Sequence, residues 1–254
     1  GIGKSRLLRV GQERAESLGI TLHRIRFAPN RPLFSQILPW ARQLNDALGP
    51  DAPPSLQLAL RTFNSPNQRG GDSRYALFDG LGAALHEQML TAPVLLLIDD
   101  LHYAARRELD MVRTLVRTLI PSVDGRLLIA ATLRPLANQE TDAMVRGHGI
   151  DVDVTTMPLK PLSESEVHTV VTSLVGDGET AQELTVRLYK QTDGNPYFVT
   201  EFLRNLVVES NKPDAPFILN PKSLSDNHLE IPRGVRALMQ RRLDAVNKQD
   251  RPLL

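Results

Sequence analysis

The first five residues, Gly-Ile-Gly-Lys-Ser, have the types and spacing of a phosphate-binding turn. A phosphate-binding loop reads G-x-x-x-x-G-K-[ST], and Gly3, Lys4 and Ser5 match its last three positions. Glycines let the backbone approach a phosphate closely, the ammonium group of a lysine can reach the β- and γ-phosphates, and a serine hydroxyl can ligate Mg²⁺. The first glycine of the pattern would precede Gly1, so we expect part of the loop to lie outside this sequence. A glycine-led helix start is the alternative.

Two adjacent acids end the most apolar stretch of the chain, VLLLIDD at 94–100. A buried strand that ends in an acid places a second Mg²⁺ contact in phosphate-binding enzymes of this kind. Asp99 would hold the metal through its hydration shell, and Asp100 would polarise an attacking water. Neighbouring residues of a strand point to opposite sides, which suits two separate roles. The alternative is a strand that ends in ordinary surface aspartates.

Two further positions could contact a nucleotide. Arg134 ends the next apolar segment, RLLIAATLR at 126–134, where a guanidinium could neutralise a γ-phosphate. An exposed arginine at a strand end is an equally good reading. In DGNPYF, Gly194 can close one helix, Asn195 can cap the next, and Pro196 fits its first turn. This structural explanation accounts for the residue types and leaves room for a contact with a nucleotide base.

The elements that position these residues alternate between strand and helix. Apolar spacing predicts helices at 4–18, 33–48, 75–90 and 109–119, and strands at 20–27, 94–100, 126–134 and 151–159. Residues 49–73 are rich in Pro, Gly, Ser and Asn, so we expect mostly loop there. Alternating strands and helices predict an α/β domain with a parallel sheet over residues 1–158.

The pattern changes after residue 158. Ser163 and Glu166 form a capping box before a helix, and two more helices are expected at 179–191 and 196–209. We therefore expect residues 159–210 to form an all-helical region. Residues 211–232 are expected to be a loop that holds a short hairpin, and a last helix follows at 235–246. We assign 211–254 to a linker and the start of a further domain.

Composition narrows the class of protein. The 254 residues are 41% hydrophobic and 23% charged, as in an ordinary globular protein, and the formal net charge is +1. This balance gives no global electrostatic argument for nucleic acid or membrane partners. The absence of cysteine excludes disulfides and cysteine-ligated metals. The apolar run Val94 to Ile98 is far too short to span a bilayer, and we expect a cytoplasmic protein.

Several segments, taken in their order along the chain, point to one known family: GIGKSRLL, VLLLIDDLHYA, LLIAATLRP, MPLKPLSESEV, QTDGNPYFVTEFLRNL and IPRGVRALMQRRLDAV. Together they resemble the STAND ATPases, signal-transduction P-loop ATPases related to the AAA+ class. The closest likeness is to bacterial ATPase modules in LuxR-type regulators and beside cyclase or protein-kinase domains. It implies a P-loop NTPase parallel sheet with its first strand missing from this sequence, then a helical lid, then the start of a helical or winged-helix element.

The resemblance also implies roles for individual residues. Its Walker A and B motifs, first sensor and lid GxP motif give these assignments: nucleotide binding by Gly1, Gly3, Lys4, Ser5, Arg6, Gly194 and Pro196; Mg²⁺ binding by Ser5 and Asp99; catalysis by Asp100 and Arg134. One departure is the Tyr103-Ala104-Ala105 segment, where the family often has Trp-Ala-Asp. Any role of that acid cannot be carried over to this chain.

The expected function is an ATP-binding, slowly hydrolysing switch module of a larger regulatory protein, with ATP and Mg²⁺ as cofactors. Its expected partners are an output domain in the same polypeptide or a partner protein, with a nucleotide-dependent homo-oligomer as a further option. One alternative is a nucleotide-locked scaffold or DNA-binding transcriptional regulator without hydrolysis. Another is an AAA+ remodelling ATPase, which is disfavoured because no arginine finger can be identified from the sequence.

Overall fold

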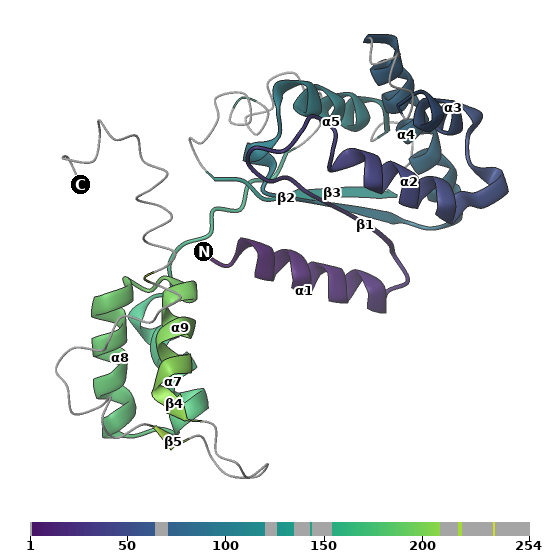
Figure 1. Cartoon of the computed structure of the whole chain (residues 1–254). Helices are drawn as coiled ribbons and strands as arrows, with labels where there is room; N and C mark the ends of the chain where they lie inside the picture. The colour runs from purple at the N-terminus through teal and green to yellow at the C-terminus, as the bar shows by residue number, and fades with distance from the viewer. Residues whose placement is uncertain are drawn as a thin grey trace, which may run out of the picture. The chain divides into compact units, whose positions relative to one another are not determined.

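The computed structural model describes residues 2–63, 71–119, 126–134, 143, 154–208, 218–219 and 236 (Figure 1). The chain divides into two compact units: one spans Lys4–Met157, and the other comprises Gly1–Gly3 and Pro158–Leu254. Within the described ranges, no helix combines the length and the apolar character needed to cross a membrane.

A three-stranded parallel sheet forms the centre of the first unit. Its strands lie in the order β1 (Thr21–Arg26), β2 (Val94–Asp99) and β3 (Leu127–Ala131). All six residues of β2 are buried, because β2 has a strand on each side and helices cover both faces of the sheet. The sheet confirms the α/β class with parallel strands that the alternating pattern predicts.

The two faces of the sheet are covered by different helices (Figure 1). On one face, α1 (Lys4–Ser17) packs Leu8 and Ala15 against Leu95 and Leu97 of β2. The larger core lies on the opposite face and includes the residues of β2 that alternate with Leu95 and Leu97. The helices of that face are α2 (Ile37–Leu48), α3 (Pro54–Phe63), α4 (Gly71–Thr91) and α5 (Arg106–Leu119). The side chains of β2 therefore point alternately into the two cores.

The expectation of a loop over 49–73 is wrong for most of its described residues. A 3₁₀ turn, η1 (Gly49–Asp51), leads into α3, and α4 already begins at Gly71. The helix α3 forms because Leu56 and Ala59 are fully buried, which outweighs the Pro-rich surroundings. The helices α3 and α4 approach closely at Gly80, where an added Cβ would lie 2.6 Å from the Cα of Leu56.

The strand expected at 151–159 is absent from the described residues 154–159, and 151–153 lie outside the described ranges. In the described chain β3 pairs with β2 alone, so residues 154–159 have no neighbouring strand with which to form a ladder. A strand needs such a partner for its backbone N–H and C=O groups. The apolar spacing of this segment is therefore not enough to predict a strand.

The helices α7 (Glu164–Val175), α8 (Glu179–Thr192) and α9 (Pro196–Leu206) form the described core of the second unit. The capping box of Ser163 and Glu166 is confirmed. The region is not helical to residue 210, because α9 ends at Leu206. A two-residue strand, β4 (Val207–Val208), then pairs antiparallel with β5 (Ile218–Leu219). Of the helix expected at 235–246, only Arg236 is described.

Candidate nucleotide-binding site

The start of α1 supplies the first part of the candidate site. Lys4 is its first residue, and Gly3 precedes it with a φ of +96°, a conformation that favours glycine. No described atom would meet a Cβ at Gly3, so the backbone angle and not crowding calls for glycine. The first N–H groups of a helix are free to bind an anion. Arg6 is exposed in the first turn, and Gly1 lies outside the described residues.

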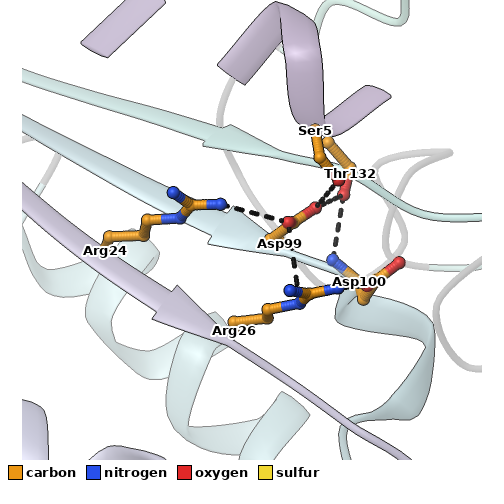
Figure 2. Close-up of polar contacts among 6 residues, drawn as sticks. All are labelled: Ser5, Arg24, Arg26, Asp99, Asp100 and Thr132. Carbon is orange, nitrogen blue, oxygen red and sulfur yellow. Dashed lines mark hydrogen bonds and ion pairs between the residues drawn. The ribbon is translucent and has the colours of Figure 1, made fainter. Parts of the chain in front are cut away.

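Asp99 lies at the centre of the site (Figure 2). Its carboxylate is fully buried and accepts hydrogen bonds from two hydroxyls, that of Thr132 at 2.6 Å and that of Ser5 at 3.3 Å. Ser5 comes from α1, Asp99 from the end of β2, and Thr132 from the residue after β3. The predicted pair of Ser5 and Asp99 is thus brought together by the fold.

Two arginines of β1 face the same carboxylate (Figure 2). The Nη2 atom of Arg24 lies 3.4 Å from Oδ2 of Asp99, and the Nε atom of Arg26 lies 3.9 Å from the same oxygen. Arg24 and Arg26 are two residues apart on β1, and Arg26 is level with Asp99 of β2, so all three side chains project from the same face of the sheet. They give the buried carboxylate positive neighbours.

The pKa of the Asp99 carboxyl is lowered overall. Burial acts to raise this pKa, but hydrogen bonds from Thr132 and Ser5 and the charges of Arg26 and Arg24 together outweigh it. Asp99 is therefore ionised at neutral pH, which suits it to hold a cation.

The turn after β2 holds Asp100 in a left-handed conformation, with φ 57° and ψ 40°. Its N–H donates to Oγ1 of Thr132 at 2.9 Å, and the N–H of Leu101 donates to the carbonyl oxygen of Thr132 at 2.8 Å. The Asp100 carboxylate pairs with the Nη2 atom of Arg26 at 3.6 Å. Thr132 thus fixes the turn that carries Asp100, while Arg26 lies beside both acids.

Arg134 lies at the same edge of the sheet as Asp100, and both line one cleft. The guanidinium carbon of Arg134 is 6.0 Å from the centroid of the Tyr103 ring. His102, the residue before Tyr103, is only 7% exposed, and neither ring nitrogen has a hydrogen-bond partner among the described residues. The pKa of His102 is lowered, mainly by burial and further by the charges of Arg134 and Lys4. The charges of Asp100 and Asp99 act to raise this pKa but are outweighed. His102 is therefore neutral at pH 7.

Sequence reasoning missed Thr132, Arg24 and Arg26. The register of the sheet pairs Arg26 with Asp99 and Ala131 with Ile98, which places Thr132 level with Asp99. Polar residues at the carboxyl ends of three neighbouring strands were the available signal. That signal becomes readable only when strand order and register are known.

The Gly194 motif of the second unit has a strong structural basis. Gly194 has φ +66°, and an added Cβ would lie 1.9 Å from the carbonyl oxygen of Leu162. The N–H of Leu162 donates to the carbonyl oxygen of Gly194 at 2.8 Å. Asn195 caps α9 by accepting from the N–H of Tyr197 at 3.1 Å, and Pro196 is the first residue of that helix. A nucleotide contact of Gly194 and Pro196 stays a prediction.

The donor set around Asp99 fits Mg²⁺. The described residues contain no cluster of three or more His, Cys, Asp or Glu side chains that could hold a metal by itself. Mg²⁺ takes oxygen ligands and commonly uses one or two protein groups together with phosphates and waters. A fully buried carboxylate beside the Ser5 hydroxyl suits this mode. Ser5 and Asp99 are the residues that would hold the ion.

Comparison with known proteins connects this geometry to a family. The family described as AAA ATPase domain matches residues 1–130, slightly more than half of the chain. The matched range contains α1, β1 and β2, with Ser5, Asp99 and Asp100. A search of curated proteins gave no match.

Proposed function

The chain belongs to the AAA ATPase domain family, and from this premise we propose that it is an ATP-dependent switch module that hydrolyses ATP slowly. Membership of the family implies nucleotide binding, and the sheet with its flanking helices is consistent with a P-loop NTPase fold. The observation that carries the proposal is the contact of Ser5, directly after Gly3 and Lys4, with the buried carboxylate of Asp99.

In this proposal the start of α1 binds the phosphates. Backbone N–H groups of the first turn face the anion, and the Lys4 ammonium neutralises the β- and γ-phosphates. Ser5 and Asp99 hold the metal ion. When bound, Mg²⁺ would offset the negative charge of the phosphates. Gly1, Gly3 and Arg6 complete the proposed binding segment.

The reacting end of the nucleotide is assigned to Asp100 and Arg134. Asp100 accepts a proton from the attacking water, and Arg134 stabilises charge that develops on the γ-phosphate. Asp100 follows β2 and Arg134 lies shortly after the neighbouring strand β3, so both are at the carboxyl edge of the sheet, and this supports the division of roles. Arg26, which pairs with Asp100 at 3.6 Å, restrains that carboxylate.

The switch role is proposed for the module as a whole. Residues 1–158 form the nucleotide-binding domain, residues 159–210 act as a lid, and residues 211–254 lead into a further domain. Gly194 and Pro196 of the lid contact the nucleotide, so that its presence changes the relation between lid and nucleotide domain. The output is read by another domain or partner protein, as in STAND regulators of the LuxR type. The sequence resemblance supports this part.

Single-turnover hydrolysis of Mg-ATP tests the proposal. We expect slow hydrolysis by the parent, and a rate lower by about a hundredfold or more in Asp100→Asn, because a positioned base typically contributes that much. Binding of Mg-ATP should persist in this variant. The matched control is Asp110→Asn, an exposed acid of α5. A parent that binds ATP without hydrolysing it would favour the nucleotide-locked scaffold, and equal rates for parent and Asp100→Asn would remove Asp100 from the mechanism.

A further inference from the structure

A cleft of about 790 Å³ opens at the carboxyl edge of the sheet, and no residue of α1 lines it. Its lining includes Arg26 from the end of β1, Arg31 from the loop that follows, and Arg134 from the segment after β3. Asp100 and Tyr103 line it as well. Its volume falls in the range of about 300–1,000 Å³ that is common for small-molecule sites. A single ion would leave most of it empty.

The charges around this cleft favour an anion. Three guanidinium groups face it together with one carboxylate, that of Asp100, which already pairs with Arg26. Among the described residues, neither Arg31 nor Arg134 has a carboxylate partner. The planar, fork-shaped donors of arginine match phosphate and carboxylate groups. Arg31 is thus available for an anionic ligand of the cleft, and Arg134 is shared with the proposed site of the γ-phosphate.

The wall that carries Arg31 is held in a defined shape. Phe34 has a left-handed backbone with φ 61°, and its N–H donates to Oε1 of Glu108 at 2.8 Å. Glu108 is only 5% exposed, and its other oxygen accepts from the N–H of Ala105 at 2.9 Å. This buried carboxylate therefore ties the loop after β1 to the start of α5. A wall fixed in this way reduces the ordering that a ligand must impose.

One polar group in the cleft has no partner. The hydroxyl of Ser35, which belongs to the same loop, is buried and makes no hydrogen bond within the described residues. A buried hydroxyl normally has a partner, since leaving it without one is costly. Because Ser35 lines the cleft, its hydroxyl is a candidate donor to an anion held there.

We propose that this cleft binds a small anionic molecule that carries phosphate or carboxylate groups, separately from the nucleotide. None of Lys4, Ser5 and Asp99 lines the cleft, so it differs from the proposed site for the nucleotide phosphates and metal ion. The two sites meet at Asp100 and Arg134. Arg134 lies over the ring of Tyr103, and both residues line the cleft.

Calorimetric titration of the nucleotide-free protein with inorganic phosphate, and separately with succinate, tests the proposal. We expect at least one of these anions to bind, and Arg31→Ala to weaken its binding about tenfold or more, because a charge-assisted hydrogen bond is lost. Arg31→Lys should retain part of the affinity. Arg14→Ala, which removes an exposed arginine from the last turn of α1, is the control for net charge.

The variant Lys4→Ala separates the cleft from the nucleotide site. We expect it to bind the anion like the parent, while Arg31→Ala binds Mg-ADP like the parent. Anion binding that is lost in Lys4→Ala and kept in Arg31→Ala would assign the anion to the nucleotide site and overturn the proposal. Absence of binding by both anions at millimolar concentration would overturn it too. Because Mg-ADP binding is measured independently, failure of the cleft is distinguishable from failure of the proposed function.

Discussion

The residues around Asp99 combine two demands on one carboxylate. Full burial would ordinarily disfavour its charge, yet hydroxyls of Thr132 and Ser5 and the guanidinium groups of Arg24 and Arg26 keep the pKa low. Both arginines are more than a third exposed, so solvent screens their contribution. The Thr132 hydroxyl, which is buried and lies 2.6 Å away, is the more specific partner. Because this hydroxyl is neutral, it orients the carboxylate without offsetting the negative charge that would attract a metal ion.

Thr132→Val tests this assignment. Valine has nearly the same shape, but it leaves the N–H of Asp100 and one oxygen of Asp99 without their partner. We expect the free energy of unfolding to fall by about 1–3 kcal/mol in Thr132→Val and by less in Thr132→Ser, which keeps the hydroxyl. Urea denaturation of both variants measures this difference. Equal losses for valine and serine would show that packing, and not the hydroxyl, matters at this position.

His102 predicts a pH dependence of stability. Burial lowers the pKa of His102 in the folded protein, whereas in the unfolded chain its imidazole has a pKa of about 6.5. The unfolded chain therefore binds the proton first, so stability is complete above this value and falls as the pH decreases toward the folded pKa. The same sign holds for His23, whose pKa is lowered mainly by burial. The pKa of Asp99 is lowered, so its contribution is lost only at a much lower pH, below its unfolded value of about 3.9.

Thermal midpoints between pH 7.5 and 5.5 isolate the histidines. We expect the midpoint of the parent to fall over this range, and His102→Gln to show a smaller fall. His86→Gln, in α4, controls for the loss of an imidazole as such. A fall in His102→Gln as steep as in the parent would contradict a buried neutral His102.

At the scale of elements, local patterns predicted the parts whose signal is contained in their own residues. The apolar run of β2 and the stripe of α5 are such cases, as is the capping box that starts α7. The short helix α3 was missed, because burial of Leu56 beneath α4 is a tertiary effect that its Pro-rich surroundings conceal. The candidate site was predicted in part. Ser5 and Asp99 belong to recognisable motifs, whereas Thr132 depends on the register between β2 and β3.

The junction of α8 and α9 yields a prediction at this scale. Gly194→Ala forces alanine into a left-handed conformation and places its Cβ against the carbonyl oxygen of Leu162. We therefore expect the free energy of unfolding of α7, α8 and α9 to fall by about 3 kcal/mol or more. Gly176→Ala is the matched control, because Gly176 also has a positive φ but meets no described atom within 4 Å. With φ 82° and ψ 168°, its backbone lies in a region that residues other than glycine rarely adopt, so the substitution should still cost about 1–3 kcal/mol, but without the added clash. Hydrogen exchange of the amides in these helices measures both. Equal protection in the two variants would contradict the close approach at Gly194.

In the whole molecule, the residues proposed to bind the nucleotide phosphates and those proposed for the switch belong largely to different units. The match to the AAA ATPase domain covers residues 1–130, and the contacts of Asp99 lie entirely within the unit Lys4–Met157. Nucleotide binding is therefore supported by that unit. The proposed switch depends in addition on Gly194 and Pro196 of the other unit, for which the sequence resemblance is the support.

The central claim is that the turn Gly3-Lys4-Ser5 at the start of α1 binds the phosphates of a nucleotide. Calorimetric titration of Mg-ATP into the parent, Lys4→Ala and Arg14→Ala tests it most directly. We expect Lys4→Ala to lose affinity by about a hundredfold, as removal of a charged hydrogen-bond donor implies, and Arg14→Ala, a cation of the same helix, to match the parent. An affinity of Lys4→Ala equal to that of the parent would contradict the claim.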